Sequence, residues 1–112
     1  MKARLTDPRA QLAARLEDHV RAVSGPRHWQ TSRPGLERAE LYVETQLQSL
    51  GLPVRRQPFS FREEPFENLI ATVPGSGSSD RRLLVGAHLD TVRGSPGAND
   101  NGSGLAGLIE VA

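Results

Sequence analysis

The residues best suited to chemistry lie near the end of the chain, within LLVGAHLDTVRGSPGANDNGSGLAGLIEVA (83–112). His88 and Asp90 are two residues apart, so on a continuing strand their side chains share one face. Asp100 follows in a run of small residues, where the backbone can turn tightly around a carboxylate. Imidazole and carboxylate donors without a thiolate suit Zn²⁺ or a similar divalent ion. This segment is therefore a candidate metal site.

The same residues also have a purely structural interpretation. His88 can be a histidine at a strand end that pairs with Asp90, and the Asn-Asp-Asn run (99–101) can serve as a turn and helix cap. Spacing alone favours neither interpretation over the other.

Two helices are predicted ahead of this segment. The first runs from about Pro8 to Ser24, because Asp7 is a suitable N-cap and Gly25 a suitable stop. The second runs from about Pro34 to Leu50 and is followed by a glycine in the C-cap region. Each has one apolar face, so both are expected to cover a sheet. The apolar positions are Leu12, Leu16, Val20 and Val23 in the first helix, and Leu36, Ala39, Val43, Leu47 and Leu50 in the second.

Three strands and a last helix complete the predicted scaffold. The strands are VRRQPFSF (54–61), FENLIATV (66–73) and RRLLVGAH (81–88), and a helix starts near Ser103. Leu69 to Ala71 are apolar enough to be buried on both faces. The third strand would be central and would deliver His88 to its carboxyl end. Open α/β sheets bind ligands at this edge, so the predicted class is α/β.

Composition excludes several other classes of protein. The 112 residues are enough for one domain, and 14 basic against 13 acidic residues leave a net charge of +1, which predicts no nucleic-acid partner. No apolar run is long enough to span a membrane, so no membrane association is expected. Charges scattered through residues 1–20 do not fit a signal peptide, and a cytoplasmic location is expected. The absence of Cys excludes disulfides.

Two further side chains, His19 and Trp29, lie outside the candidate site. His19 has no partner at helical spacing and is expected at the surface or at an edge rather than as a ligand. Trp29, beside His28, is expected to pack as core or lid; the alternative is that it lines a substrate entrance.

From Val85 onward the chain resembles the zinc-dependent aminopeptidases of clan MH, the group of bacterial leucyl aminopeptidase and aminopeptidase Y. In that family a strand ends in Gly-X-His-X-Asp-Ser/Thr, followed by Pro-Gly-Ala-Asp-Asp-Asn-Ala-Ser-Gly and an apolar helix. Asn99 and Gly102 depart from this pattern, but Asp100 keeps the position of the carboxylate that bridges two metal ions in the family. The matching residues are Gly86, His88, Asp90, Thr91, Pro96, Gly97, Ala98, Asp100, Asn101, Ser103 and Gly104. A looser resemblance upstream covers an Arg and aromatic residues after the first helix, Leu-Gly-Leu after the second, and Asn-Leu-Ile-Ala (68–71).

The resemblance implies a role for each candidate site residue. His88 would be a ligand of one of two Zn²⁺ ions, and Asp100 would bridge both. Asp90, assigned to the catalytic set, would accept the other imidazole N–H of His88 and so fix its tautomer. The family often carries a cis peptide after the bridging Asp, so a cis Asp100–Asn101 bond is predicted.

The resemblance also implies the architecture and the reaction. The expected fold is a three-layer αβα sandwich with a mixed central sheet, truncated after the third strand and the start of the next helix. Residues 1–112 would form the N-terminal part of one zinc-peptidase catalytic domain, which hydrolyses N-terminal peptide bonds with a two-zinc-activated water. Substrates would be peptides with a free N-terminus. The family's adjacent Glu-Glu pair and later Asp and His ligands cannot be placed, because Glu63 and Glu64 precede His88, so the chain alone is expected to be inactive.

Two alternatives to an aminopeptidase stay open. A glutaminyl-cyclase-like zinc acyltransferase shares much of the pattern, although the continuation NDNGSGLAGL (99–108) favours the peptidase. The other alternative is a non-catalytic, truncated binding module.

Overall fold

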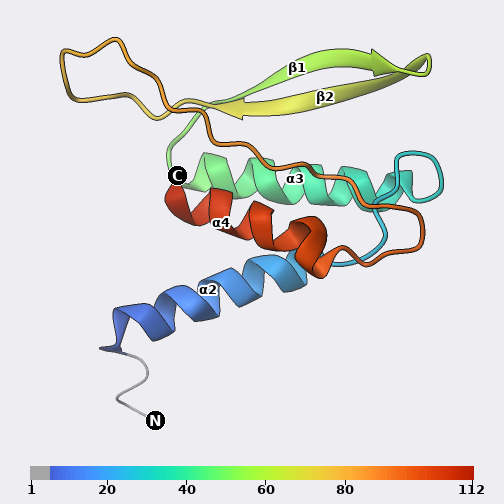
Figure 1. Cartoon of the computed structure of the whole chain (residues 1–112), viewed down its shortest axis with the longest axis horizontal. Helices are drawn as coiled ribbons and strands as arrows, with labels where there is room; N and C mark the ends of the chain where they lie inside the picture. Colours follow the sequence, from blue (N-terminus) through green and yellow to red (C-terminus); the bar gives the residue numbers. More distant parts are fainter. Residues whose placement is uncertain (1–5) are drawn as a thin grey trace.

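The computed structural model describes residues 6–112, so the first five residues of the segment used to predict the compartment lie outside it. The elements, in chain order, are α2 (Pro8–Val23), α3 (Arg33–Ser49), β1 (Val54–Phe61), β2 (Glu64–Ala71), η1 (Ala98–Ser103) and α4 (Gly104–Val111). The predicted α/β class is confirmed. In Figure 1 the β1–β2 hairpin lies over α3, and α4 lies between α3 and α2. No helix in the described range is long and apolar enough to cross a membrane.

The predicted helix signals act as expected at the start of α2 and beyond the end of α3. The Asp7 carboxylate accepts a hydrogen bond from the backbone N–H of Arg9 at 3.0 Å and so caps α2. Gly51 takes a left-handed conformation, φ 80°, just after α3. The observed ends of both helices differ from the predicted ends by at most one residue.

The two strands form one antiparallel hairpin with an unbroken register from Val54 opposite Ala71 to Phe61 opposite Glu64. The turn consists of Arg62 and Glu63, whose φ angles of 49° and 65° are both positive. Two successive left-handed residues are what a two-residue hairpin turn of the favoured hand requires. Strand β2 consequently begins two residues earlier than predicted. Its residues 69–71 are half-buried rather than buried on both faces.

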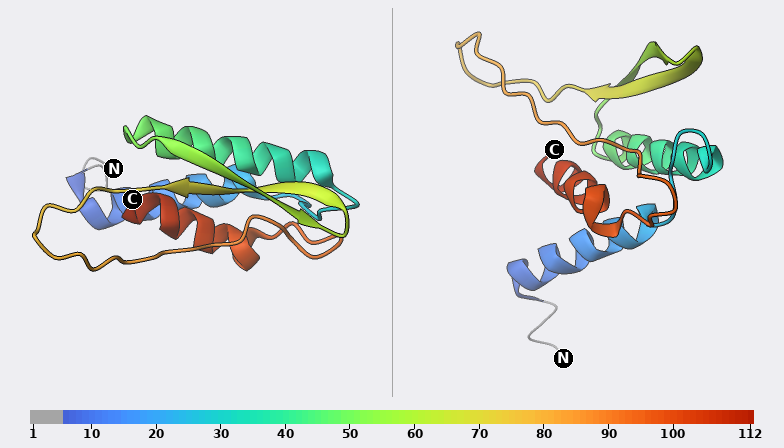
Figure 2. Two further views of the ribbon diagram at one scale, coloured as in Figure 1. Left: turned by 90° about the horizontal axis from the view of Figure 1, so that it is seen from above. Right: turned by 45° about the vertical axis from the view of Figure 1, so that its right-hand side comes forward.

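The core lies among three helices, because α2 and α3 both pack against α4. Among the helices of residues 6–112, α3 alone lies against the hairpin, and α2 contacts α4, η1 and α3. The expectation that both helices cover the sheet is therefore wrong for α2. The right-hand view of Figure 2 shows the hairpin, α3, α4 and α2 in this order from top to bottom. The buried cluster consists of Val23, Ala39, Val43, Leu47, Leu105 and Ile109.

The predicted third strand, 81–88, is not paired in the structure. The chain runs past the hairpin and the helices without joining the sheet, which contains β1 and β2 alone in the described range (Figure 1). Leu83 and Leu84 are 91% and 94% exposed. A strand of this apolar type is stable when neighbouring elements cover both of its faces, and here neither leucine is covered.

His19 is buried, contrary to its expected surface position. It is 7% exposed and lies where α2, α3 and α4 meet. Its Nδ1 is 2.7 Å from the Tyr42 hydroxyl, and its Nε2 is 2.9 Å from Glu110 Oε2. Since a carboxylate only accepts, Nε2 donates to Glu110; a neutral imidazole with this tautomer accepts from the Tyr42 hydroxyl at Nδ1. The partners come from other helices, so spacing within α2 could not reveal them.

Candidate metal site

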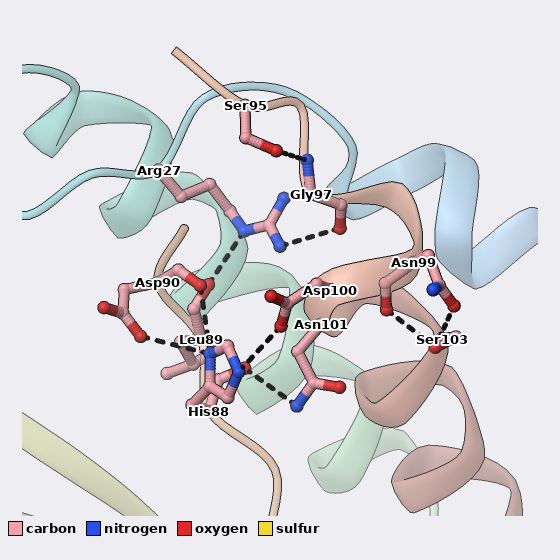
Figure 3. Close-up of polar contacts among 10 residues, drawn as sticks. All are labelled: Arg27, His88, Leu89, Asp90, Ser95, Gly97, Asn99, Asp100, Asn101 and Ser103. Carbon is pink, nitrogen blue, oxygen red and sulfur yellow. Dashed lines mark hydrogen bonds and ion pairs between the residues drawn. The ribbon is translucent and has the colours of Figure 1, made fainter. Parts of the chain in front are cut away.

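The three predicted site residues lie together, with His88 between two carboxylates (Figure 3). His88 Nδ1 is 3.1 Å from the backbone oxygen of Asp90 and 3.2 Å from its Oδ1. On the other side of the ring, His88 Nε2 is 3.1 Å from Oδ1 of Asp100. Asp90 follows His88 on the unpaired segment, whereas Asp100 belongs to η1. Tertiary structure therefore joins two parts of the site that the sequence separates.

Both ring nitrogens of His88 lie near carboxylate oxygens. A neutral imidazole carries a single N–H, but both nitrogens of His88 face carboxylate oxygens, which only accept. If Nδ1–H donates to Asp90, the lone pair of Nε2 points at Asp100. In that tautomer Nε2 is the ring nitrogen available to a metal ion.

The distance between Nε2 of His88 and Oδ1 of Asp100 suits two ligands of one ion. Two ligands of a tetrahedral Zn²⁺ lie about 3.3 Å apart, given Zn–N and Zn–O distances of about 2.0–2.2 Å. The 3.1 Å separation is close to this value. The donors present therefore fit zinc in type and in separation.

The number of donors is smaller than a complete site needs. In residues 6–112, no three His, Cys, Asp or Glu side chains come together so that they could hold a metal ion. The side chains of His88, Asp90 and Asp100 are 55%, 53% and 78% exposed. Zinc sites usually have three or four protein donors, so further donors would have to approach this open face.

The backbone around Asp100 departs from the helix that follows it. Asp100 and Asn101 have φ/ψ of −103°/93° and −126°/34°, which interrupt η1. The Asp100–Asn101 peptide bond is cis, as predicted. The Asn101 side chain points toward the backbone oxygen of His88, with its Nδ2 at 3.5 Å. The break in η1 places the Asp100 carboxylate beside the imidazole.

Arg27 is the residue of this region that sequence reasoning did not assign a role. It is 1% exposed and is among the largest fully buried side chains. Its guanidinium donates to five backbone oxygens, including that of Leu89, between His88 and Asp90. Burial lowers the pKa of Arg27, and the charge of Asp90 opposes this effect. The only signal in the sequence was the loose resemblance of an Arg after the first helix.

An aromatic surface borders the site. Trp29 and Phe61 contact each other edge to face, with ring centroids 5.5 Å apart. Both line a pocket of about 310 Å³ that also contains His88, Asp90 and Asp100. Trp29 is half-buried and packs against Phe61 and Phe66 of the hairpin, so it is not a fully buried core residue, and its place on this pocket leaves the substrate-entrance alternative open.

Comparison with known proteins identifies the class of protein to which the chain is related. It is 39% identical over 80 residues to leupeptin-inactivating enzyme 1 of Streptomyces exfoliatus, covering 71% of this chain and 18% of that protein. It is 51% identical over 45 residues to the probable lipoprotein aminopeptidase LpqL of Mycobacterium tuberculosis, covering 40% and 9%. It is 31% identical over 116 residues to the uncharacterized protein YfbL of Escherichia coli, covering 94% and 35%. No solved structure gives a significant match.

These matches relate the chain to peptidases. Residues 68–112 match the model of Peptidase family M28. This match and the relatives named as aminopeptidases confirm the resemblance to aminopeptidases that the motif indicated. The chain spans between 9% and 35% of the length of the three relatives above.

Proposed function

We propose that this chain is part of the catalytic domain of a zinc aminopeptidase and supplies one side of its metal centre. The observation that carries the proposal is the position of His88, whose ring nitrogens face Asp90 and Asp100 at 3.2 and 3.1 Å. The peptidase relatives and the family match support the reaction class.

Each side chain has a distinct role in this proposal. His88 Nε2 and the Asp100 carboxylate would hold zinc, with Asp100 shared between two ions. Asp90 would accept from Nδ1–H and so orient the ring, with Nε2 as the nitrogen that faces the metal. When bound, zinc supplies Lewis-acid polarisation of a carbonyl and lowers the pKa of a water molecule. The substrates would be peptides with a free N-terminus.

The domain proposal rests on the exposed apolar surface as well as on the relatives. Leu83 and Leu84 are more than nine-tenths exposed, and Val85 is 51% exposed. In a complete three-layer sandwich this segment would become an internal strand with both faces covered. The proposal predicts that the gene encodes an adjacent Glu-Glu pair after Ala112, and that the 112-residue chain alone releases no product from an aminoacyl nitroanilide.

Zinc titration of the chain, followed by the ¹⁵N resonances of the His88 ring, tests the metal site directly. We expect Zn²⁺ to shift the Nε2 resonance. Asp90→Asn is expected to weaken binding about 10- to 100-fold, because the charged carboxylate that orients the imidazole is replaced by a neutral amide. Asp100→Asn, which removes a ligand, should weaken binding at least as much.

Asp80→Asn serves as the matched control, because it removes an exposed carboxylate from another loop. It should leave the titration unchanged. If Zn²⁺ left the His88 resonances in place, or if all three variants bound equally well, the metal assignment would be wrong.

A further inference from the structure

Arg27 carries a buried positive charge, and its guanidinium donates hydrogen bonds to backbone oxygens. Arg27 follows α2 and is 1% exposed, and its guanidinium has no hydrogen-bonded carboxylate partner among the described residues. Burying a charge is costly unless hydrogen bonds compensate for the lost water. Here the compensation comes from carbonyl groups of the chain itself.

The five acceptors come from three separate stretches of backbone. Nη1 donates to the oxygens of Val23 at 2.6 Å and Gly25 at 3.1 Å, where α2 ends. Nε donates to Leu89 at 2.8 Å. The remaining contacts are to the segment that enters η1, with Nη1 3.0 Å from the oxygen of Pro96 and Nη2 3.1 Å from that of Gly97.

These stretches carry the two halves of the candidate metal site. Leu89 lies between His88 and Asp90, and Gly97 lies at the start of η1, which carries Asp100 (Figure 3). One rigid guanidinium therefore joins both halves to the end of α2.

Backbone contacts of Arg27 reinforce the same connection. Its N–H donates to Oγ1 of Thr91 at 2.9 Å, and its carbonyl accepts from the N–H of Thr91 at 3.2 Å. Gly25 N–H also donates to the oxygen of Pro96 at 2.8 Å. Backbone hydrogen bonds at Thr91 and at Pro96 therefore join the segment after Asp90 to the loop that carries Arg27.

Lysine could not replace this set of contacts. A guanidinium presents five N–H groups in a fixed plane, whereas an ammonium is a point charge with three donors. Three separate backbone stretches around one side chain need donors that diverge in fixed directions. The pattern is therefore specific to arginine rather than to positive charge.

We propose that Arg27 is a positioning residue that sets the separation of His88 from Asp100 and thereby the affinity of the site for zinc. The second part of this inference rests on the proposed function; the first does not. Arg27 touches neither ligand side chain and acts through the carbonyls of Leu89 and Gly97.

Arg27→Lys tests the proposal in the metal-free and in the zinc-loaded chain. Without metal, wild type should show a nuclear Overhauser effect between the imidazole Hε1 of His88 and the β-protons of Asp100. Arg27→Lys should lose this signal and bind Zn²⁺ about 10- to 100-fold more weakly, as expected when ligand orientation is lost. Arg93→Lys is the matched control, because Arg93 is exposed, lies on the segment between Asp90 and η1, and donates to the Gln30 side chain rather than to the backbone of the site. It should retain both properties.

The outcomes separate the two proposals. If wild type failed to bind Zn²⁺ at His88, the proposed function would fail, and Arg27 would be judged by the metal-free signal alone. A folded Arg27→Lys chain that kept this signal would overturn the positioning role. If Arg27→Lys did not fold, Arg27→Ala with millimolar guanidinium would replace it. Recovery of the His88–Asp100 signal would then support the proposal, and recovery of the fold without that signal would refute it.

Discussion

Gly97 shows how closely the chain packs around the buried arginine. Its φ of 58° is left-handed, and a Cβ at this position would overlap Cγ2 of Thr91 and lie 2.8 Å from Nη2 of Arg27. Only glycine has both the backbone freedom and the absent side chain that this position requires. The chain therefore leaves no room for a side chain at Gly97, beside the buried Arg27.

Gly97→Ala is expected to lower the free energy of unfolding by about 1–3 kcal/mol, through left-handed strain and overpacking. Urea denaturation measures this change. Gly107→Ala is the matched control, because Gly107 lies in α4 and a Cβ there meets nothing within 4 Å. It should raise stability by up to about 1 kcal/mol, since alanine is the better helix former. Equal effects of the two substitutions would contradict the packing argument.

At the level of elements, three helices meet at one imidazole. His19 of α2 contacts Tyr42 of α3 and Glu110 of α4. Burial raises the pKa of the Tyr42 hydroxyl, which therefore stays protonated and available as a donor at neutral pH. Apolar side chains of the three helices form the buried cluster, and the contacts of His19 link the same helices through polar groups.

Tyr42→Phe removes the hydroxyl 2.7 Å from His19 Nδ1 and keeps the ring. We expect a loss of about 1 kcal/mol in the free energy of unfolding, because one buried hydrogen bond is lost and Nδ1 is left without a partner. Thr45→Val, on the exposed face of the same helix, is the control and should change stability by less than about 0.5 kcal/mol. Thermal unfolding followed by circular dichroism distinguishes them, and an unchanged Tyr42→Phe chain would refute the role of this contact.

For the whole molecule, acid stability depends on how α2 is joined to α4. The hydrogen bond from Arg15, at 2.7 Å, lowers the pKa of Glu110, and the contact with His19 lowers it further. A carboxyl whose pKa is lower in the folded state stabilises the fold above its ordinary pKa of 4.5 and loses this contribution as the pH falls. Glu40 acts in the opposite direction, because burial raises its pKa.

Replacing Glu110 with Gln isolates the first effect. Between neutral pH and about pH 3, the free energy of unfolding of the wild-type chain should fall more steeply than that of Glu110→Gln, and the two curves should converge in acid. Denaturant titrations at a series of pH values measure this difference. Glu37→Gln, which alters an exposed carboxyl of α3, is the control and should follow the wild-type curve. Parallel curves for wild type and Glu110→Gln would contradict the assignment.

Local sequence determined the parts of this molecule that depend on neighbouring residues. Apolar spacing and the caps at Asp7 and Gly51 predicted α2 and α3, and alternation predicted most of the hairpin, because these signals act within a few residues. The motif around His88 and Asp100 predicted the cis bond and the peptidase family.

Tertiary structure decided what depends on distant partners. Burial of His19 requires side chains from α3 and α4, and the role of Arg27 requires carbonyls from three stretches of backbone. The segment 81–88 was predicted as a strand from its apolar side chains, but a strand needs a hydrogen-bonded neighbour and covered faces, which local sequence does not supply. The sequence by itself therefore determined which residues could bind a metal, whereas packing around Arg27 decided that His88 and Asp100 meet.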